Sequence, residues 1–348
     1  MYDDANEDLQ NMLADRVGQL KIPRVDPKNH IPHTTRDLAD IKTLHAQFRW
    51  EAVRDRSSIN GNGLEAEEEV TSIQKSFPAV VQANVQCAMA AWLFILCFVD
   101  DLLDRLSPDD GVTVAQQLAH SMMPMTSSPT ERMRKQDALA VHFSDTSTAD
   151  KSVPERLKHA VLCFREHSKI WVPDVVYDRF CTDVSEVFSA MATDIQFKNR
   201  RDRDLFAYIN IRTISIGTGP FFCLLRFSMG YTRYPTPQLF LLESCVSSLS
   251  ALLNDIIGLE REIAAKEWMN YAIICSNYRG DLVGQGTLEL EPGIRQTVEE
   301  YHLLLELAHE YWNNILEENC EEDIHVAASL LDFVAQHFHV ERCSKRYT

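Results

Sequence analysis

The sequence has little positive charge for its length. Its 348 residues carry 34 lysine and arginine side chains against 51 aspartate and glutamate side chains, a formal net charge of −17. Nucleic acids and anionic membranes are bound by basic surfaces, so this balance argues against both as partners. An anionic small molecule would have to be bound through metal ions or through a few focused basic residues.

The sequence also lacks a spaced cysteine motif and a secretory signal. Nine cysteines are scattered without a CxxC pair, and most, such as Cys87 and Cys223, lie in apolar runs. This predicts reduced core thiols in a cytoplasmic protein, not disulfides or a zinc site. Residues 1–20 carry several acids and no apolar signal core. The most apolar stretch, 80–99, contains three polar amides and ends in acids, so we predict a buried core helix, not a membrane span.

Strand patterns, internal repeats and interdomain linkers are absent as well. Alternation of apolar and polar residues is rare, and no hairpin turn lies between two alternating runs. Apolar residues instead recur at three- and four-residue spacings, which is typical of helices, in 113–123, 154–169, 238–266 and 296–318. We expect one all-α domain of about ten helices over residues 1–348. Residues 1–40 are predicted to be a loosely ordered strap on its outside.

An acidic motif follows the most apolar stretch. On a helix, Asp100 and Asp104 lie on one face, about 6 Å apart along the axis. Two carboxylates so close repel each other unless a cation neutralises them, and hard oxygen ligands of this kind suit Mg²⁺. The alternative is an acidic helix end that faces water, which the helix dipole opposes.

A second polar stripe interrupts another long apolar helix. Asn254, Gly258 and Glu262 are spaced four residues apart and rotate by only about 40° per step, so they share one face. The amide oxygen of Asn254 and the carboxylate of Glu262 are again ligands for a hard cation. The alternative is an ordinary polar stripe with Glu262 in water. However, Asn254 and Asp255 interrupt an apolar run, where buried polar groups need partners.

Together, the two motifs resemble the metal-binding signature of microbial class I terpene synthases, most of all fungal and bacterial sesquiterpene cyclases. The resemblance implies an all-α class I terpenoid synthase-type bundle around an apolar cavity. It also implies three Mg²⁺ ions that hold the substrate diphosphate, two bound by Asp100 and Asp104 and one by Asn254 and Glu262. The sequence departs from the family at Gly258, where a serine or threonine hydroxyl is usual. A water molecule can take that coordination position.

Basic residues extend the resemblance along the chain. Arg212 stands about forty residues before the second motif, as the diphosphate-sensing arginine of the family does, and a predicted helix break at Gly217 follows it. Arg261 resembles the basic residue that often precedes the glutamate, and Arg346-Tyr347 resembles the pair that closes over the diphosphate. A guanidinium suits phosphate oxygens through its planar fork of donors. The resemblance therefore implies catalytic roles for Arg212, Arg261, Arg346 and Tyr347.

The pocket walls are predicted from position. A carbocation is stabilised by aromatic faces, and apolar side chains fix the fold of a prenyl tail. Residues one or two turns before Asp100, together with those around the helix break and one tryptophan, are the candidates. They are Leu93, Leu96, Cys97, Ile216, Gly217, Phe221, Phe222 and Trp312. For each aromatic residue the alternative is plain core packing. The acidic run 65–69 is predicted to be a solvated helix start.

The resemblance implies Mg²⁺-dependent ionisation and cyclisation of a prenyl diphosphate in a cytoplasmic monomer or homodimer. The product would be a cyclic hydrocarbon or alcohol plus diphosphate. Farnesyl diphosphate is the favoured substrate, and geranyl and geranylgeranyl diphosphate stay open. A chain-elongating synthase would need a second aspartate-rich motif, and a head-to-head synthase would need two DxxxD motifs. A non-catalytic helical scaffold would leave the two buried acidic stripes unexplained.

Overall fold

The computed structural model describes residues 2–23, 38–53, 62–123, 152–198, 204–231, 233–265, 267, 269–276 and 286–343. The regular elements of these residues are all α-helices, which confirms the predicted fold class. They are α1 (Tyr2–Gln19), α2 (Leu38–Val53), α3 (Asn62–Ser76), α4 (Ala83–Leu103), α5 (Pro108–Met122), α7 (Val153–Trp171), α8 (Asp174–Lys198), α9 (Leu205–Ser215), α10 (Thr218–Ser228), α11 (Pro237–Ala265), α12 (Tyr271–Cys275), α13 (Gly286–Glu318) and α14 (Glu321–Cys343).

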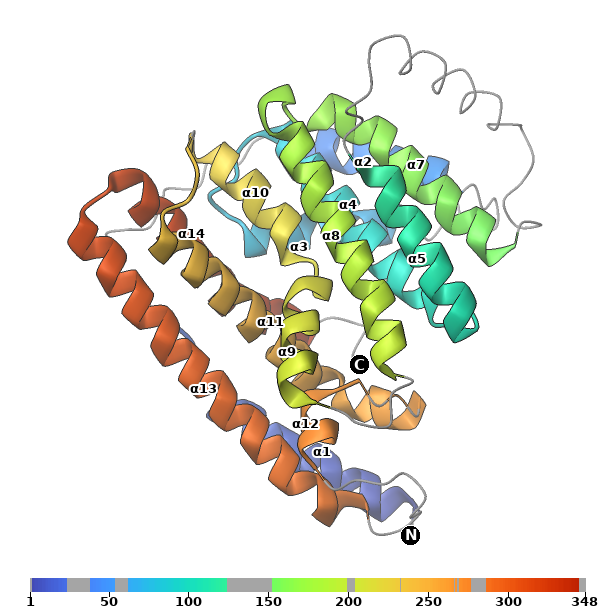
Figure 1. Cartoon of the computed structure of the whole chain (residues 1–348), viewed down its shortest axis with the longest axis vertical. Coiled ribbons are helices and arrows are strands. Elements are labelled where there is room, and N and C mark those ends of the chain that lie inside the picture. Colours follow the sequence, from blue (N-terminus) through green and yellow to red (C-terminus); the bar gives the residue numbers. More distant parts are fainter. Residues whose placement is uncertain are drawn as a thin grey trace.

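Two long apolar helices, α4 and α11, carry much of the core. Helix α4 packs against α2, α3, α7 and α10, whereas α11 packs against α9, α13 and α14 (Figure 1). By length and composition alone both helices could cross a membrane, but 67% of the apolar window of each is buried inside the molecule. Burial of this extent is expected of the core helices of a bundle. The placement of α4 agrees with the core helix predicted at 80–99.

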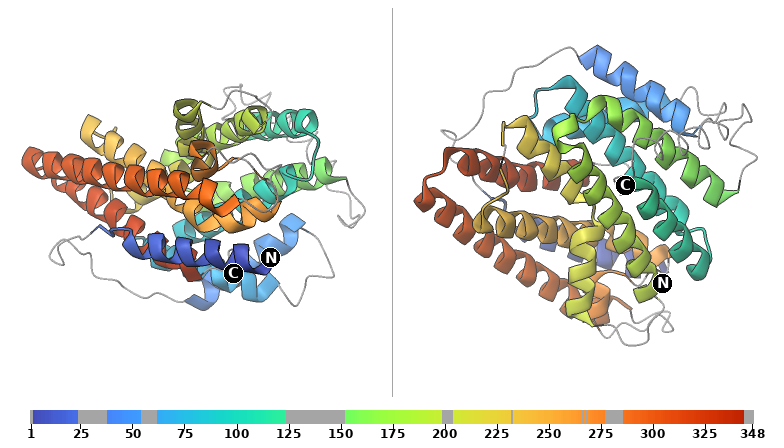
Figure 2. Two further views of the ribbon diagram at one scale, coloured as in Figure 1. Left: turned by 90° about the horizontal axis from the view of Figure 1, so that it is seen from below. Right: turned by 45° about the horizontal axis from the view of Figure 1, so that its top comes forward.

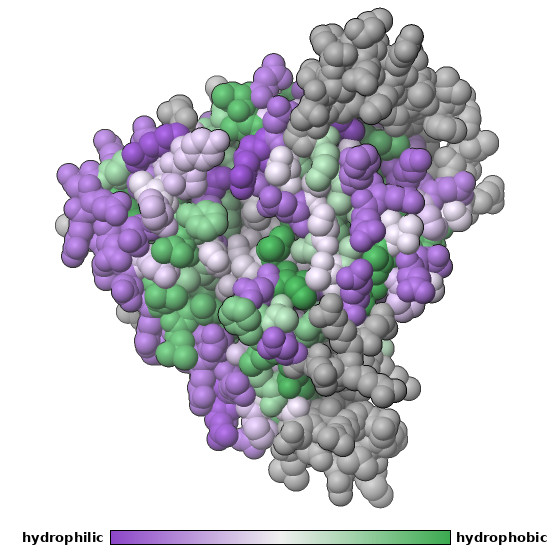
Figure 3. All heavy atoms as spheres, in the orientation of Figure 1, coloured by the Kyte–Doolittle hydropathy of each residue, from purple (hydrophilic) through white to green (hydrophobic). Residues whose placement is uncertain are grey.

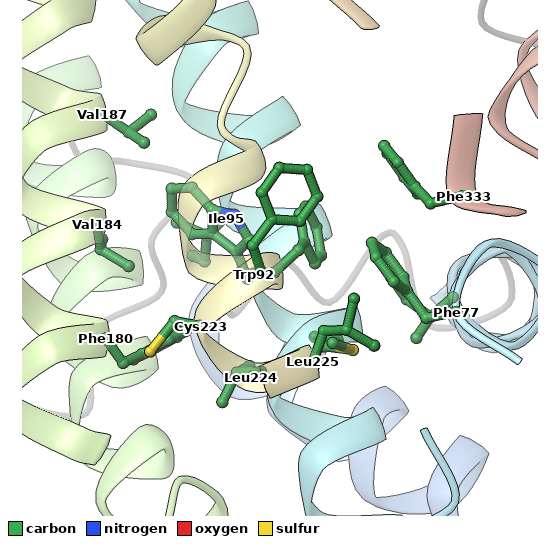
Figure 4. Packing of buried hydrophobic residues seen from close by; sticks show 14 of the residues in the cluster. Phe77, Trp92, Ile95, Phe180, Val184, Val187, Cys223, Leu224, Leu225 and Phe333 are labelled. Carbon is green, nitrogen blue, oxygen red and sulfur yellow. The ribbon is translucent and has the colours of Figure 1, made fainter. Parts of the chain in front are cut away.

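Aromatic side chains fill the space around α4. Trp92 is fully buried, and its ring centroid lies 5.9 Å from that of Phe188 on α8. On the other side, Phe77, which follows α3, and Phe333 of α14 stack with centroids 4.8 Å apart and face each other in Figure 4. Such rings bury large apolar areas and prefer offset or edge contacts. They connect α4 to α8, and the end of α3 to α14, across long distances in the sequence.

The chain breaks between α9 and α10 at Gly217. Its φ of 79° lies in the left-handed region that glycine adopts at little cost. Its carbonyl oxygen accepts a hydrogen bond of 2.9 Å from Trp92 Nε1. A Cβ at this position would lie 2.7 Å from two methyl carbons of Leu96. The helix break predicted at Gly217 is therefore present, and the close approach of α4 requires glycine there.

The outer layer differs from the prediction at the N-terminus. Residues 2–19, expected to be part of a loosely ordered strap, form the helix α1, which lies along α13 in Figures 1 and 2. Leu13 packs in a small apolar cluster with Leu259 and Ile294, and Arg16 pairs with Glu291 at 3.5 Å. The burial of these apolar side chains explains the helix. Residues 24–37 of the strap lie outside the described residues.

Helix α13 contains a proline and a glycine near its N-terminal end. Helix α13 begins at Gly286 and continues past Pro292 and Gly293. A Cβ at Gly293 would lie 2.0 Å from the carbonyl oxygen of Ala272. Glycine therefore serves here to let α12 approach the helix, and it does not end the helix.

The surface is mixed in character. Figure 3 shows hydrophilic side chains along the edges of one face, with hydrophobic side chains between them. Large apolar side chains such as Phe206, Tyr234 and Phe240 are exposed. Isolated apolar side chains are common on protein surfaces and carry no functional meaning by themselves.

Candidate active site

A cavity of about 1030 Å³ is lined by residues of α2, α3, α4, α8, α9, α10, α11 and α14. Along α4 its lining changes from Leu93 and Leu96 to Asp100 and Asp104, so an apolar wall leads to a charged end. The aromatic rings of Phe77, just after α3, Phe221 on α10 and Phe333 on α14 complete the apolar part. The volume lies at the upper end of the usual range for ligand pockets. The cavity can therefore hold a long apolar molecule with an anionic head group.

Five of the eight predicted pocket residues line this cavity: Leu93, Leu96, Cys97, Ile216 and Phe221. The other three do not belong to its lining in the part of the chain that the structure describes.

Each of these three has a different environment. Gly217 lies behind Leu96, which fills the space in front of it. Phe222 is buried and packs edge-on against Phe333 with ring centroids 5.8 Å apart. Trp312 is half-buried on α13 and packs against the core. Successive helical residues point about 100° apart, and here Phe221 lines the cavity while Phe222 points to the ring of Phe333.

The first acidic motif lies at the C-terminal end of α4. The backbone N–H of Asp104 donates to the carbonyl oxygen of Asp100 at 3.2 Å, so helical geometry continues to Asp104. Both side chains line the cavity, as their spacing predicts. Lys198 of α8 also lines it, and its Nζ lies 3.0 Å from Asp104 Oδ1. This lysine places a positive charge beside the motif, and nothing in its sequence context indicated a role.

The second motif places Asn254 and Glu262 of α11 on the lining of the same cavity. Gly258, between them on the stripe, is buried. The Glu262 side chain is nearly inaccessible, and its Oε2 accepts a hydrogen bond of 2.7 Å from Asn270 Nδ2. Burial raises the pKa of the Glu262 carboxyl to about 8, and the charge of Asp255 adds to the shift. A carboxylate in this setting is costly without a cation nearby.

The residues present fit a magnesium site. Asp100, Asp104, Asn254 and Glu262 offer only oxygen ligands, and all four line one cavity. Mg²⁺ prefers such ligands and completes its shell with water or substrate phosphates. The acidic side chains come from two helices that sequence alone could not place together.

Arg212 lies at the same charged end, on α9. Its NH2 group donates to Asn254 Oδ1 at 2.7 Å, and its Nε donates to Asp255 Oδ1 at 3.4 Å. Asp255 is fully buried and also accepts hydrogen bonds from the Tyr208 hydroxyl at 2.5 Å and the Tyr271 N–H at 2.9 Å. Burial opposes the charge of Arg212, but Asp255 raises the arginine's pKa well above its usual value. The guanidinium is therefore charged and held in place beside Asn254.

Two polar residues at this site gave no sequence signal. Asn270 is fully buried and donates from Nδ2 both to the Asp255 carbonyl oxygen at 2.6 Å and to Glu262 Oε2. Asp194 of α8 lines the cavity, and its Oδ1 is buried without a hydrogen-bond partner within the described residues. Burial raises the pKa of Asp194 to about 6, although Arg212 opposes the shift. Both residues lie outside the two motifs, so only the tertiary structure shows them.

The remaining predicted residues fall in two groups. Arg261 lines the cavity, one residue before Glu262. Arg346 and Tyr347 lie outside the described residues.

The acidic run 65–69 lies at the start of α3, where Glu65, Glu67 and Glu68 are exposed as predicted, but two of its acids also share a basic partner. Glu65 and Glu69 of α3 both pair with Arg49 of α2, which is almost completely buried. The Arg49 guanidinium carbon lies 4.5 Å from the ring centroid of Phe94. Arg49 and Phe94 both line the cavity, so a cation–π pair forms part of its wall. The sequence could not indicate this pairing because Arg49 lies on a different helix.

Solved structures share this architecture. The chain matches 2-methylisoborneol synthase from Streptomyces coelicolor A3(2), in complex with Mg²⁺ and geranyl-S-thiolodiphosphate, at a TM-score of 0.65 and 12% identity, covering 92% of this chain and 96% of that one. It matches linalool/nerolidol synthase from Streptomyces clavuligerus, in complex with 2-fluorogeranyl diphosphate, at a TM-score of 0.58 and 17% identity, covering 91% and 99%. At such identities the likeness establishes the class I terpene synthase fold. No curated protein matches the sequence at a significant level.

The sequence also matches a family model directly. The model is that of terpene synthase family 2, C-terminal metal binding, and it matches residues 91–282. These residues are more than half of the chain and include both acidic motifs and Arg212. The chain therefore belongs to terpene synthase family 2 and is a terpene cyclase, a Mg²⁺-dependent lyase that acts on a prenyl diphosphate.

Proposed function

We propose that the protein ionises farnesyl diphosphate with the help of three Mg²⁺ ions and cyclises the resulting cation to a terpene hydrocarbon or alcohol. One observation carries this proposal: the apolar wall of Leu93, Leu96 and Phe221 and the ligands of both acidic motifs line one cavity. Such a cavity offers an ionic end for a diphosphate and an apolar end for the prenyl chain.

The charged end would bind the head group. Asp100 and Asp104 would hold two ions, and Asn254 and Glu262 would hold the third, with water in place of a Gly258 side chain. When bound, Mg²⁺ stabilises the negative charge that the departing diphosphate develops. Arg212 donates from a position fixed by Asp255, so it can bind phosphate oxygens without reorganising.

Three further residues are assigned to the diphosphate by position. Arg261 lines the cavity beside Glu262, and we assign it to the same phosphate oxygens. Arg346 and Tyr347 are assigned to closing the site over the bound substrate. Together with Arg212 they would exclude water while the carbon–oxygen bond breaks.

The apolar end would control the cation. Aromatic rings of Phe77, Phe94 and Phe221 line it and can stabilise positive charge through their faces. Leu93 and Leu96 restrict how the prenyl chain folds, which brings reacting carbons together. No side-chain base is required, since the released diphosphate can accept the final proton.

Geranyl diphosphate is the second candidate substrate. Both similar enzymes named above were crystallised with geranyl analogues. The size of the cavity supports the longer farnesyl chain. We further propose one catalytic domain over residues 1–348, a cytoplasmic location, and a monomer or homodimer.

The direct test is a product assay. Purified protein is incubated with Mg²⁺ and, separately, geranyl, farnesyl and geranylgeranyl diphosphate, and the organic extract is analysed by gas chromatography–mass spectrometry. We expect a cyclic product from farnesyl diphosphate, lost in Asp100→Ala and Asn254→Ala. A cyclic product from another substrate only would correct the chain length. A longer linear diphosphate, formed only with added isopentenyl diphosphate, would contradict cyclisation.

A further inference from the structure

A cluster of three metal-binding residue types lies outside the cavity, where the end of α2 meets α7. Glu51 comes from α2, and Cys163 and His167 come from α7. Their potential ligand atoms all lie within 4.8 Å of one another. None of the three residues lines the cavity of the proposed cyclase site. Neither the terpene cyclase chemistry nor the acidic motifs use this cluster.

We propose that Glu51, Cys163 and His167 bind a single Zn²⁺-type transition-metal ion that links α2 to α7. A thiolate, an imidazole and a carboxylate form a mixed sulfur, nitrogen and oxygen donor set. Zn²⁺ accepts this set, whereas Mg²⁺ prefers oxygen ligands alone. The site therefore selects a different metal from the one that the acidic motifs fit.

The geometry is close to that of a bound ion. Cys163 and His167 are four residues apart on one helix, so they share a face. Glu51 Oε2 lies 2.7 Å from His167 Nε2, which puts the third ligand across the helix interface. In a tetrahedral zinc site the ligand atoms are roughly 3.3–3.8 Å apart, as the metal–ligand distances require. Small side-chain rotations convert the present cluster into that arrangement, with water as the fourth ligand.

Binding follows a simple proton balance. The Cys163 thiol loses its proton to solvent and forms the metal–sulfur bond. The proton that His167 Nε2 donates to Glu51 also leaves Nε2, so that His167 binds through Nε2 as a neutral imidazole with its remaining proton on Nδ1, and Glu51 binds as carboxylate. The hydrogen bond between His167 and Glu51 is replaced by two metal–ligand bonds. No oxidant or other reactant is needed.

Neighbouring residues hold the ligands in position. The His159 Nε2, one turn before Cys163, donates to the Glu51 carbonyl oxygen at 3.0 Å and fixes the end of α2. The His167 ring packs against Trp171 with centroids 4.8 Å apart. The Cys163 side chain is buried, while Glu51 keeps 33% of its side-chain surface exposed. A metal ion can therefore approach from the Glu51 side and reach a shielded thiol.

The scattered cysteines predicted no zinc site because the ligands come from two helices far apart in sequence. Only the packing of α2 against α7 brings Glu51 to the pair on α7. An ion here would stabilise that helix contact by binding the folded state alone.

Cobalt is the probe for the test. Full-length protein is treated with a chelator, dialysed into excess Mg²⁺ to occupy the acidic motifs, and titrated with Co²⁺ without prenyl diphosphate. We expect an intense thiolate-to-cobalt charge-transfer band that saturates at one equivalent and disappears on addition of Zn²⁺. Cys163→Ser should abolish the band. Cys97→Ser, which removes the thiol nearest the acidic motif in the cavity, should keep it.

A second measurement covers the case in which Cys163→Ser folds poorly. Glu51→Gln changes a partly exposed side chain, and it should weaken Zn²⁺ binding in calorimetry more than about tenfold. No band in the wild-type protein, or a band that survives Cys163→Ser, would overturn the site. Equal Zn²⁺ affinity in wild type and Glu51→Gln would also overturn it. None of these results bears on product formation with Mg²⁺, so the cyclase proposal is tested separately.

Discussion

Asn270 connects two parts of the second acidic motif through one side chain. Its Nδ2 group donates to the Asp255 carbonyl oxygen and to Glu262 Oε2, and its Oδ1 accepts from the Ala272 N–H at 2.9 Å. Glu262 is a proposed metal ligand whose carboxylate would otherwise be free to rotate. We therefore assign Asn270 as a positioning residue that sets the direction of this carboxylate.

Replacing Asn270 tests this role. Asn270→Ala should raise the Mg²⁺ concentration for half-maximal activity by about 10–100-fold. It should also lower the free energy of unfolding by about 1–3 kcal/mol, because buried acceptors lose their donor. Mg²⁺ titration of product formation and denaturant unfolding measure the two effects. Asn210→Ala is the control, since Asn210 is exposed and bonds only the Phe206 carbonyl oxygen in the described structure. An unchanged Mg²⁺ requirement in Asn270→Ala would contradict the assignment.

The adjacent rings of Phe221 and Phe222 offer a second comparison of single residues. Phe221 lines the cavity, whereas Phe222 packs against Phe333 behind it. Phe221→Leu should change the ratio of products, because a ring that faces the cation is lost. Phe222→Leu should lower stability by about 1 kcal/mol or more and leave the product ratio unchanged. Gas chromatography of both variants separates cavity lining from core packing. The same product change in both variants would contradict the placement.

At the scale of elements, the break between α9 and α10 sets how closely α4 approaches. Gly217 and Gly230 have nearly equal positive φ values, 79° and 76°. A Cβ at Gly217 would meet Leu96, whereas one at Gly230 would meet nothing within 4 Å. Alanine substitutions at the two glycines therefore distinguish the effect of backbone strain, which both would have, from that of a steric clash, which only Gly217→Ala would have.

We expect Gly230→Ala to lower the free energy of unfolding by about 1–2 kcal/mol, the cost of a left-handed residue with a Cβ. Gly217→Ala should lose a further amount of about 1–3 kcal/mol through overpacking. Because Leu96 lines the cavity, Gly217→Ala should also shift the product ratio. Urea unfolding and product analysis of both variants check this. Equal destabilisation of Gly217→Ala and Gly230→Ala would show that the Leu96 side chain moves aside without a loss of stability.

Helix α8 carries a buried carboxylate with a measurable pH signature. Burial raises the pKa of Asp183 to about 6, although its ion pair with Arg179 at 2.8 Å opposes the shift. The folded state therefore holds a proton that the unfolded chain has released between about pH 4 and pH 6. The contribution of Asp183 to the free energy of unfolding therefore falls by up to about 3 kcal/mol as the pH rises from about 4 to about 6. Above about pH 6 this contribution is constant.

Asp183→Asn should remove this dependence of the unfolding free energy on pH. The difference in unfolding free energy between wild type and variant is measured at several pH values from 4 to 7. Loss of the ion pair with Arg179 changes the difference in unfolding free energy by a nearly constant amount, and it changes the pH dependence of that difference little. Asp178→Asn removes one charge from the exposed side of the same helix and serves as the control. A difference that does not vary with pH would contradict the raised pKa of Asp183.

How much the sequence could predict depends on how local each feature is. The periodicity of apolar residues predicted α5, α7 and α11, and the four-residue spacing of Asp100 and Asp104 placed them on one helix face. Helix α1 was not predicted, because residues 1–20 are rich in acids and the helix is stabilised by contacts with α11 and α13. Asn270, Lys198 and the partner of Glu69 were missed for the same reason. Each acts through a contact with a helix distant in sequence.

At the scale of the whole molecule, the net charge of −17 repels an anionic ligand such as diphosphate. The basic residues of the cavity stand among at least as many acids. The acids are Glu65, Glu68, Glu69, Asp100, Asp101, Asp104, Asp194, Glu262 and Glu267, and the bases are Arg49, Arg105, Lys198, Arg212 and Arg261. A free anion gains little from a set in which acids outnumber bases. Added Mg²⁺ changes the balance, so metal and diphosphate should bind together.

This coupling distinguishes a cyclase site from a helical scaffold without any product assay. Inorganic diphosphate alone should leave the melting temperature unchanged, while Mg²⁺ and diphosphate together should raise it. At about 100 times the dissociation constant, the gain is about 2.7 kcal/mol in unfolding free energy. Asp100→Ala should lose the gain. Asp109→Ala, which changes an exposed acid in the first turn of α5, should keep it. Equal shifts in both variants would mean that the ligands bind elsewhere, because Asp100 lies at the charged end of the cavity and Asp109 does not line it.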